Sequence, residues 1–214
     1  MARRTKEDAN KTREQLIDAA ETVFHAKGVS STSLNDIANE AGVTRGAIYW
    51  HFKNKHDIFE AMISRQEMPL DMMRSMVEDP EAPDPLGRLK SFLLFITREI
   101  ARDKRRRRVC EIIFQKCELI EANEPLGTRH RQNFVEGAAR LSTIMQNAIR
   151  RGQLPADLEI DRAIVHLHVQ LTGLIYMWLL LPDSFDMEQE SERAIETYFY
   201  SLPCCFSKSG GASH

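Results

Sequence analysis

The amino-acid sequence predicts an all-α protein with a small N-terminal head and a larger helical body. Apolar residues recur at the helical period of 3.6 in almost every segment, and nowhere do they alternate for long enough to indicate a sheet. Glycines, prolines or charged turns separate these periodic segments. About nine helices are therefore expected, one for each periodic segment.

Three short helices make up the expected head. The first runs over about residues 11–27, and Gly28 follows as a stop signal. The second starts near Ser33, which has capping-box spacing with Asp36. The third starts with Thr44 as its N-cap, after a short glycine-containing turn. Such a joint between two helices is typical of a helix-turn-helix.

The body is expected to contain the remaining helices. A fourth helix starts at Lys55 with Asn54 as its N-cap, and Pro69 should kink or split it before residues 70–77. A proline-rich break follows at residues 79–85. Further helices are expected near residues 86–102, 105–120, 126–151, 161–181 and 187–202.

Length and composition indicate a soluble globular protein. The chain has 214 residues, of which 43% are hydrophobic, and a net charge of -2 that does not by itself indicate a nucleic-acid binder. We assign residues 1–56 to the head, residues 57–202 to the body, and residues 203–214 to a flexible tail without a function.

The sequence favours a cytoplasmic protein without a membrane partner, a metal or a cofactor. The longest apolar run, residues 171–181, is about half of the ~20 residues that a membrane span needs, and the N-terminus lacks the apolar core of a signal peptide. The four cysteines are too few for a disulfide framework. Cys204 and Cys205 have no nearby partners at metal-ligand spacing.

The third helix has the residues of a DNA-reading surface. Ile48 and Phe52 are four residues apart and can bury together, which leaves exposed aromatic and basic side chains that need an explanation. Near the start of the helix, Arg45 can reach guanine acceptors, Gly46 lets the backbone approach the bases, and Ala47 can meet a thymine methyl. The alternative is a generic three-helix unit whose aromatic residues pack on a neighbour.

Flanking side chains would contact phosphates and so set the register on DNA. Tyr49, His51 and Lys55 offer hydroxyl, imidazole and ammonium donors, and Thr32 or Ser33 would anchor the opposite strand. The complete DNA-binding set that we predict is Thr32, Ser33, Thr44, Arg45, Gly46, Ala47, Tyr49, Trp50, His51 and Lys55.

The helix near residues 161–181 predicts a homodimer. Its second half is apolar nearly all round, and such a helix needs neighbours on every side, which one small domain can hardly supply. Pairing this helix and the last one with their copies would form a four-helix interface. Twofold symmetry would then place two reading helices about 34 to 36 Å apart on a pseudo-palindromic DNA site.

The same helix carries the candidate ligand residues His168, Thr172 and Tyr176, which recur every four residues and form one polar stripe in apolar surroundings. Ligand pockets are mostly apolar with a few placed polar groups. A packed core remains the alternative, because periodicity cannot separate the two. Neighbouring helices would complete the chamber with Leu93, Ile96, Cys110, Phe114, Cys117 and Phe134.

The basic run at residues 104–108 is expected to be a solvated or ion-paired surface of the body, far from the head. We expect no enzyme, because no Ser/His/Asp or metal-spaced constellation stands out.

The residues of the head carry a resemblance to a known family. Residues 42–46, with the sequence Gly-Val-Thr-Arg-Gly, and residues 49–52, with the sequence Tyr-Trp-His-Phe, followed by Lys55, resemble the recognition segment of the TetR family of bacterial repressors. In the body the chain is similar to the AcrR-like branch of that family. The similar body segments include residues 111–114, 116–118, 151–155 and 178–182.

This resemblance implies a dimeric repressor of a multidrug efflux operon that binds operator DNA and is released by a small hydrophobic or aromatic effector. The helix that starts at Lys55 would carry the change, because it joins the reading helix to the body. The alternative is a DNA-binding regulator or architectural protein without a small-molecule effector.

Overall fold

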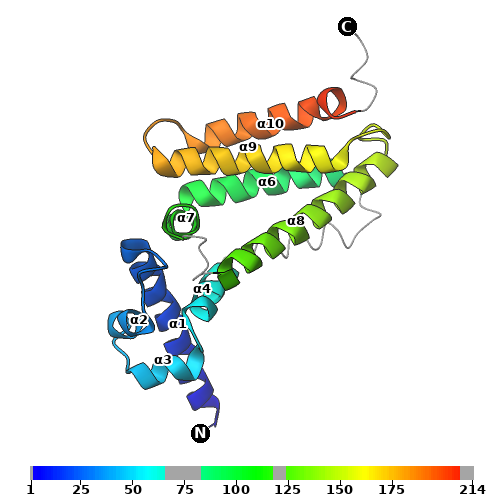
Figure 1. Ribbon diagram of the computed structural model, residues 1–214. Helices are drawn as coiled ribbons and strands as arrows, with labels where there is room; N and C mark the ends of the chain where they lie inside the picture. The colour runs from blue at the N-terminus through cyan, green and yellow to red at the C-terminus, as the bar shows by residue number, and fades with distance from the viewer. Residues whose placement is uncertain (1, 66–82, 118–123, 208–214) are drawn as a thin grey trace. The chain divides into compact units, whose positions relative to one another are not determined.

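The computed structural model describes residues 2–65, 83–117 and 124–207 (Figure 1). These residues form nine α-helices and one π-helical turn, and they contain no strand, which confirms the all-α prediction. The α-helices are α1 (Ala2–Lys27), α2 (Leu34–Glu40), α3 (Arg45–His51), α4 (Lys55–Ser64), α6 (Pro85–Arg102), α7 (Lys104–Glu111), α8 (Glu124–Arg150), α9 (Ile160–Leu180) and α10 (Met187–Cys205), and the π-helical turn is η1 (Ile112–Lys116).

The helices group into two compact units. Unit 1 consists of Met1–Glu67 and Lys104–His130, and unit 2 consists of Met68–Asp103 and Arg131–His214. The first unit therefore includes α4, α7 and η1 in addition to the three helices of the head. The functional division at residue 56 that the sequence suggests stays a prediction.

Unit 1 forms the predicted helix-turn-helix through local capping bonds. Ser33 and Asp36 make the reciprocal bonds of a capping box at the start of α2. The Thr44 side chain accepts from the backbone N–H of Ala47 and begins α3. In the turn between these helices, Gly42 has a φ of +66°, a conformation that favours glycine.

Helix α1 is longer than predicted, because it begins at Ala2 instead of near residue 11. Residues 6–8 are charged and exposed, so they add a helical extension with no apolar face that hydrophobic periodicity could reveal. Helix α4 ends at Ser64. The expected kink at Pro69 lies outside the described residues.

The prediction of one regular helix over residues 105–120 is wrong. The α-helical part ends at Glu111, and Ile112–Lys116 form the π-helical turn. The Lys116 carbonyl accepts from the backbone N–H of Val29 at 2.9 Å, at the turn between α1 and α2. The expectation that residues 104–108 lie far from the head is also wrong, because α7 packs against α1.

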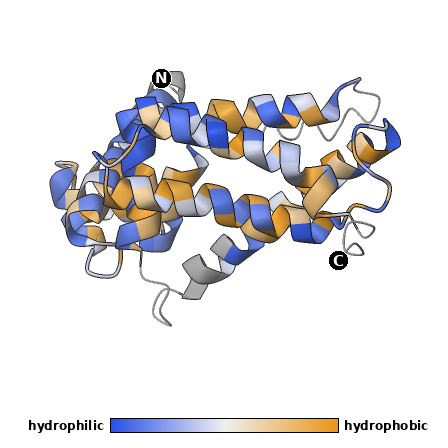
Figure 2. Ribbon diagram, turned by 90° about the horizontal axis from the view of Figure 1, so that it is seen from above, coloured by the Kyte–Doolittle hydropathy of each residue, from blue (hydrophilic) through white to orange (hydrophobic). Residues whose placement is uncertain are grey.

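Unit 2 packs α10 against both α6 and α9. Its core includes Leu89, Ile144, Met145, Leu167 and Ile195. Most helices carry both hydrophobic and hydrophilic residues in Figure 2, as expected of helices that bury one face.

The chain from residue 203 was expected to be a flexible tail, and for residues 203–207 this expectation is wrong. Helix α10 continues through Pro203 to Cys205. Phe206 is buried, lies against the ring of Tyr198, and accepts through its carbonyl from the backbone N–H of Glu159 at 2.7 Å. Burial of the Phe206 ring favours the continued helix. Residues 208–214 lie outside the described ranges.

Candidate nucleic-acid interface and effector site

Helix α3 presents its aromatic residues to solvent. Ile48 and Phe52 are buried in the core of unit 1, as predicted. On the opposite side Tyr49 is 48% exposed and Trp50 is 73% exposed. The alternative that these aromatic rings pack on a neighbour does not hold within unit 1, because such large apolar areas remain open to a partner.

The start of α3 combines a fixed backbone with an exposed cation. The Arg45 guanidinium lies 5.6 Å from the centre of the Tyr49 ring and donates to its hydroxyl oxygen at 3.5 Å. This hydrogen bond raises the pKa of Arg45, so the side chain stays charged. A Cβ on Gly46 would meet only the Thr44 hydroxyl oxygen, at 3.9 Å. The packing of unit 1 therefore does not require a glycine at this position.

His51 lies at the end of α3 in a half-buried position next to Arg13. Burial lowers the pKa of His51, and the positive charge of Arg13 lowers it further. The Arg13 guanidinium also lies 5.3 Å from the centre of the Phe52 ring. The free protein therefore carries a neutral His51 imidazole at pH 7, which can donate one hydrogen bond but adds no charge.

Lys55 has a structural role that sequence reasoning missed. Its ammonium group donates to the backbone carbonyls of Val29 and Ser30, each at 2.9 Å. These bonds join the first residue of α4 to the turn between α1 and α2, 25 and 26 residues earlier in the chain. The predicted phosphate contact of Lys55 stays a prediction, because the ammonium has a third proton to donate.

Of the two proposed anchors at the start of α2, only Ser33 is exposed. Thr32 is buried, and its hydroxyl donates to the Gly28 carbonyl at 2.7 Å. The Thr32 side chain therefore supports the turn, and a contact with the opposite DNA strand would fall to Ser33.

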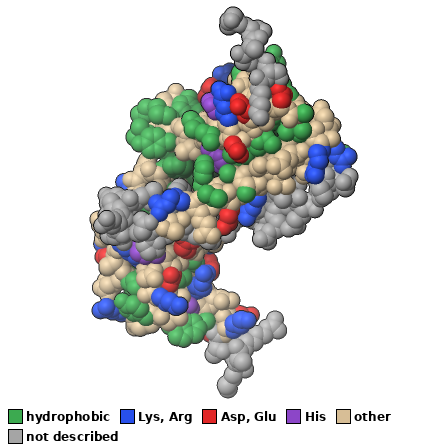
Figure 3. Space-filling view, turned by 45° about the vertical axis from the view of Figure 1, so that its right-hand side comes forward, with side chains coloured by type: hydrophobic (Ala, Val, Ile, Leu, Met, Phe, Trp, Pro, Cys, Tyr) green, Lys and Arg blue, Asp and Glu red, His purple; other side chains and the backbone are tan. Residues whose placement is uncertain are grey.

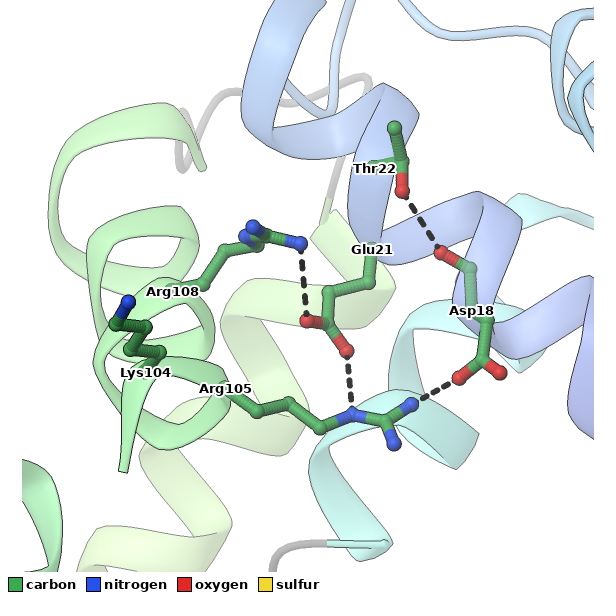
Figure 4. A pocket seen from close by; sticks show the side chains of 6 residues that line it. All are labelled: Asp18, Glu21, Thr22, Lys104, Arg105 and Arg108. Atoms are coloured by element: carbon green, nitrogen blue, oxygen red, sulfur yellow. Dashed lines mark hydrogen bonds and ion pairs between the residues drawn. The ribbon is translucent and has the colours of Figure 1, made fainter. Parts of the chain in front are cut away.

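A buried carboxylate on α1 binds arginines from α7 (Figure 4) and from the end of α4. Glu21 is only 3% exposed, and its carboxylate lies 3.1 Å from Arg65, 3.0 Å from Arg105 and 3.7 Å from Arg108. Asp18 pairs with Arg65 and Arg105 beside it. We call these five residues the Glu21 cluster. The Glu21 cluster borders an open pocket of about 320 Å³. The ion pairs of Arg105 and Arg108 confirm that part of the basic run at residues 104–108 is ion-paired.

The predicted chamber residues fall into the two units. Unit 2 contains Leu93, Ile96, Phe134, His168, Thr172 and Tyr176. Among these the structure brings Phe134 and His168 together, with ring centres 4.4 Å apart. Leu93 is a core residue, and Thr172 and Tyr176 are exposed.

The other three candidates, Cys110, Phe114 and Cys117, belong to unit 1 and are half-buried. Burial raises the pKa of the Cys110 thiol to about 11, and Cys117 packs against the core of the head. A single chamber lined by both sets stays a prediction. Among the residues described, no three His, Cys, Asp or Glu side chains lie close enough to hold a metal ion.

Helix α9 leaves one apolar face uncovered. We define the α9 face by its exposed members Val165, Val169, Tyr176 and Leu180, which follow helical spacing. On α10 the ring of Tyr200 is 83% exposed, and hydrophobic side chains gather on the surface of this part of the molecule in Figure 3.

By length and composition α9 could cross a membrane. It also packs against α10, and Ala163, Ile164 and Leu167 contribute to the core of unit 2. These contacts are those of a core helix with one open face.

The helix-turn-helix with its exposed third helix defines a DNA-binding regulatory protein. Two family models match the chain: the bacterial regulatory proteins of the tetR family at residues 16–62, and the C-terminal region of the MAATS-type transcriptional repressors at residues 84–203. The chain belongs to the TetR family of bacterial transcriptional regulators.

Individual relatives align along nearly the whole chain. The chain is 41% identical to the transcriptional regulator TtgR of Pseudomonas putida, over 92% of this chain and 94% of the relative. It is 38% identical to the regulator AcrR of Shigella flexneri, over 89% of each.

Among solved structures, the chain is similar to NalD, the secondary repressor of the MexAB-OprM multidrug efflux pump in Pseudomonas aeruginosa. The TM-score is 0.82 at 31% identity, over 94% of this chain and 100% of NalD. A complex of SmeT, from Stenotrophomonas maltophilia, with triclosan gives a TM-score of 0.80 at 27% identity, over 94% of this chain and 93% of SmeT.

Proposed function

We propose that this protein represses a multidrug efflux operon by binding its operator as a homodimer, and that small aromatic or amphipathic compounds release it. The observation that carries the proposal is the α3 surface, where Arg45, Tyr49 and Trp50 are exposed on a helix whose opposite side is fixed in the core. The similarity to NalD and to SmeT, both repressors of multidrug efflux pumps, supports the kind of operon. Operator DNA lies in the cytoplasm, so the repressor acts there.

In the proposed dimer, the α9 face and the exposed side of α10 meet the same surfaces of a second copy. The large apolar side chains of this face are poorly suited to water, and a twofold partner would cover them without any other protein. This arrangement assigns Tyr176 to the interface and places two α3 helices about 34 to 36 Å apart on DNA.

Release by an effector requires that the compound binds a DNA-incompetent state more tightly than the competent one. We propose that helices α4 and α7 transmit the effect of effector binding to the head. Only Asp103 separates α7 from α6, and the Glu21 cluster holds both α7 and the end of α4 against α1. A displacement of α7 would therefore act on the head directly.

The test is a footprint on the promoter next to the gene, repeated with a panel of dyes, drugs and phenolic compounds. We expect a protected pseudo-palindrome that at least one compound clears, and relaxed sequence preference in Arg45→Ala. Protection that no compound changes would favour a DNA-binding protein without an effector. A protein that shows no sequence preference on DNA would contradict the proposal.

A further inference from the structure

We propose that Cys204 and Cys205 form a binding site for trivalent arsenicals that carry one organic substituent, and that occupation of this site loosens the C-terminal anchor of α10. The site lies on the last turn of α10 and belongs to unit 2. It contains none of the residues assigned above to DNA or to the effector chamber. The inference therefore goes beyond the proposed function and does not depend on it.

Both thiols of the pair are open to solvent. Cys204 and Cys205 are free cysteines with exposed side chains, whereas Cys110 and Cys117 are half-buried. Because the two residues are adjacent in the chain, a reagent bound to the first thiol meets the second within the same turn of helix. The second bond is then an intramolecular event, which raises the overall affinity of a bridging ligand about 10²- to 10⁴-fold.

The backbone disfavours a direct disulfide within the pair. Neighbouring Cα atoms are about 3.8 Å apart, whereas the two Cα atoms of an unstrained disulfide are about 4.4 Å apart or more. Successive side chains of an α-helix also point about 100° away from each other. A bridging atom lengthens the path between the two sulfurs and relieves this mismatch. The pair therefore stays a dithiol that one thiophilic atom can bridge.

The number of available ligands selects arsenic over zinc. Structural zinc takes four ligands, and in the described part of the chain no three His, Cys, Asp or Glu side chains lie close enough to hold a metal ion. A trivalent arsenical with one organic substituent has two positions left, which two soft thiol ligands can fill. With phenylarsine oxide, two As–S bonds form, the bonds from arsenic to its oxygen and two S–H bonds break, and the oxygen leaves as water. Arsenic stays trivalent, so no oxidant or reductant is needed.

The residue that follows the pair anchors α10 to the start of α9. Phe206 is 5% exposed, and its ring centre lies 5.0 Å from that of His166. Its carbonyl accepts from the backbone N–H of Glu159 at 2.7 Å. To bring two diverging thiols to one atom, the last turn of α10 must rotate. Because Phe206 follows Cys205 directly, this rotation acts on its bond to Glu159.

The test measures capture of phenylarsine oxide by the full-length protein, using intact-mass spectrometry and peptide mapping. We expect a single phenylarsenic group per chain, held by Cys204 and Cys205. Excess 2-mercaptoethanol should leave it in place, whereas the dithiol 2,3-dimercaptopropanol should remove it. Phenylarsonic acid is the ligand control, because it keeps the ring but carries pentavalent arsenic, and it should not bind.

Variants separate the pair from the other thiols. Cys204→Ser and Cys205→Ser each leave one exposed thiol and should bind phenylarsine oxide about 10²- to 10⁴-fold more weakly than the wild type. Cys110→Ala removes a half-buried thiol outside the pair and should keep the wild-type affinity. The coupling is measured by amide hydrogen exchange: the Glu159 N–H should exchange faster in the arsenical-bound wild type, but not in Cys204→Ser after the same treatment.

Wild-type affinity in Cys204→Ser, capture at Cys110 or Cys117 instead, an adduct that joins two chains, or equal binding of phenylarsonic acid would overturn the site. An unchanged Glu159 amide in the arsenical-bound wild type would overturn its coupling to the anchor. None of these results bears on the proposed function, which the operator footprint tests separately.

Discussion

Replacement of Lys55 by methionine tests the structural role of this side chain together with its predicted phosphate contact. Methionine keeps an unbranched stem but removes the ammonium, and with it the two hydrogen bonds to the carbonyls of Val29 and Ser30. Hydrogen bonds from a charged group contribute about 1.5 to 3 kcal/mol each when both partners are sequestered. Lys55 is half-buried, so water can replace part of the loss, and we expect the free energy of unfolding to fall by about 2 to 3 kcal/mol.

Thermal unfolding and operator binding measure the two roles separately. For a protein of this size the expected loss corresponds to a fall in Tm of about 4 to 12 °C. If the third proton of Lys55 also reaches a phosphate, the slope of log affinity against log salt should become shallower by about 1. Lys53→Met is the matched control for stability, because Lys53 is exposed two positions earlier and should leave Tm unchanged. A Lys55→Met protein as stable as the wild type would refute the reasoning from the two carbonyl bonds.

Three further predictions concern charge, reactivity and assembly. The lowered pKa of His51 leaves the ring neutral in the free protein. Because a nearby phosphate favours the protonated form, operator affinity should rise as the pH falls from 7.5 to 6. An operator affinity that does not change with pH, in the wild type and in His51→Gln alike, would exclude a phosphate contact at this ring. The raised pKa of Cys110 keeps its side chain a thiol at pH 8. Iodoacetamide at this pH should therefore alkylate the exposed Cys204 well before Cys110, as measured by peptide mapping. Equal alkylation rates would show that Cys110 is more accessible than its burial implies. Val169→Asp places a charge on the α9 face and should shift the protein from dimer to monomer in sedimentation. Thr197→Asp changes an exposed residue of α10 and tests how far the interface extends. If the Val169→Asp protein still dimerises with wild-type affinity, the interface lies elsewhere.

The local features of the head were predictable because their causes lie within a few residues. The capping box of Ser33 and Asp36, the Thr44 cap and the glycine turn before it all depend on neighbours in the chain, and each occurs where the sequence predicts it. The exposure of Tyr49 and Trp50 follows from the same logic, because Ile48 and Phe52 define which side of α3 is buried.

Two misjudged segments show where periodicity ends as a guide. The N-terminal part of α1 has no apolar stripe, so it gives no periodic signal although it is helical. Residues 203–207 were expected to belong to a flexible tail, but α10 continues to Cys205 and Phe206 is buried. In both cases the helix extends beyond the residues that form a repeating apolar face, so hydrophobic periodicity could not locate its end.

The sequence by itself determined the all-α class, the helix-turn-helix and the residues that α3 exposes to solvent, because short-range capping and the apolar period decide them. Only the tertiary structure decided that Lys55 holds the turn at Val29, that α7 belongs with the head through Glu21, and that the His168 ring lies against Phe134. An apolar period tells which face of a helix is buried but not which helix covers it. Partners distant in the chain meet only when whole helices pack, and these partners determine which polar groups are occupied and which remain free to bind.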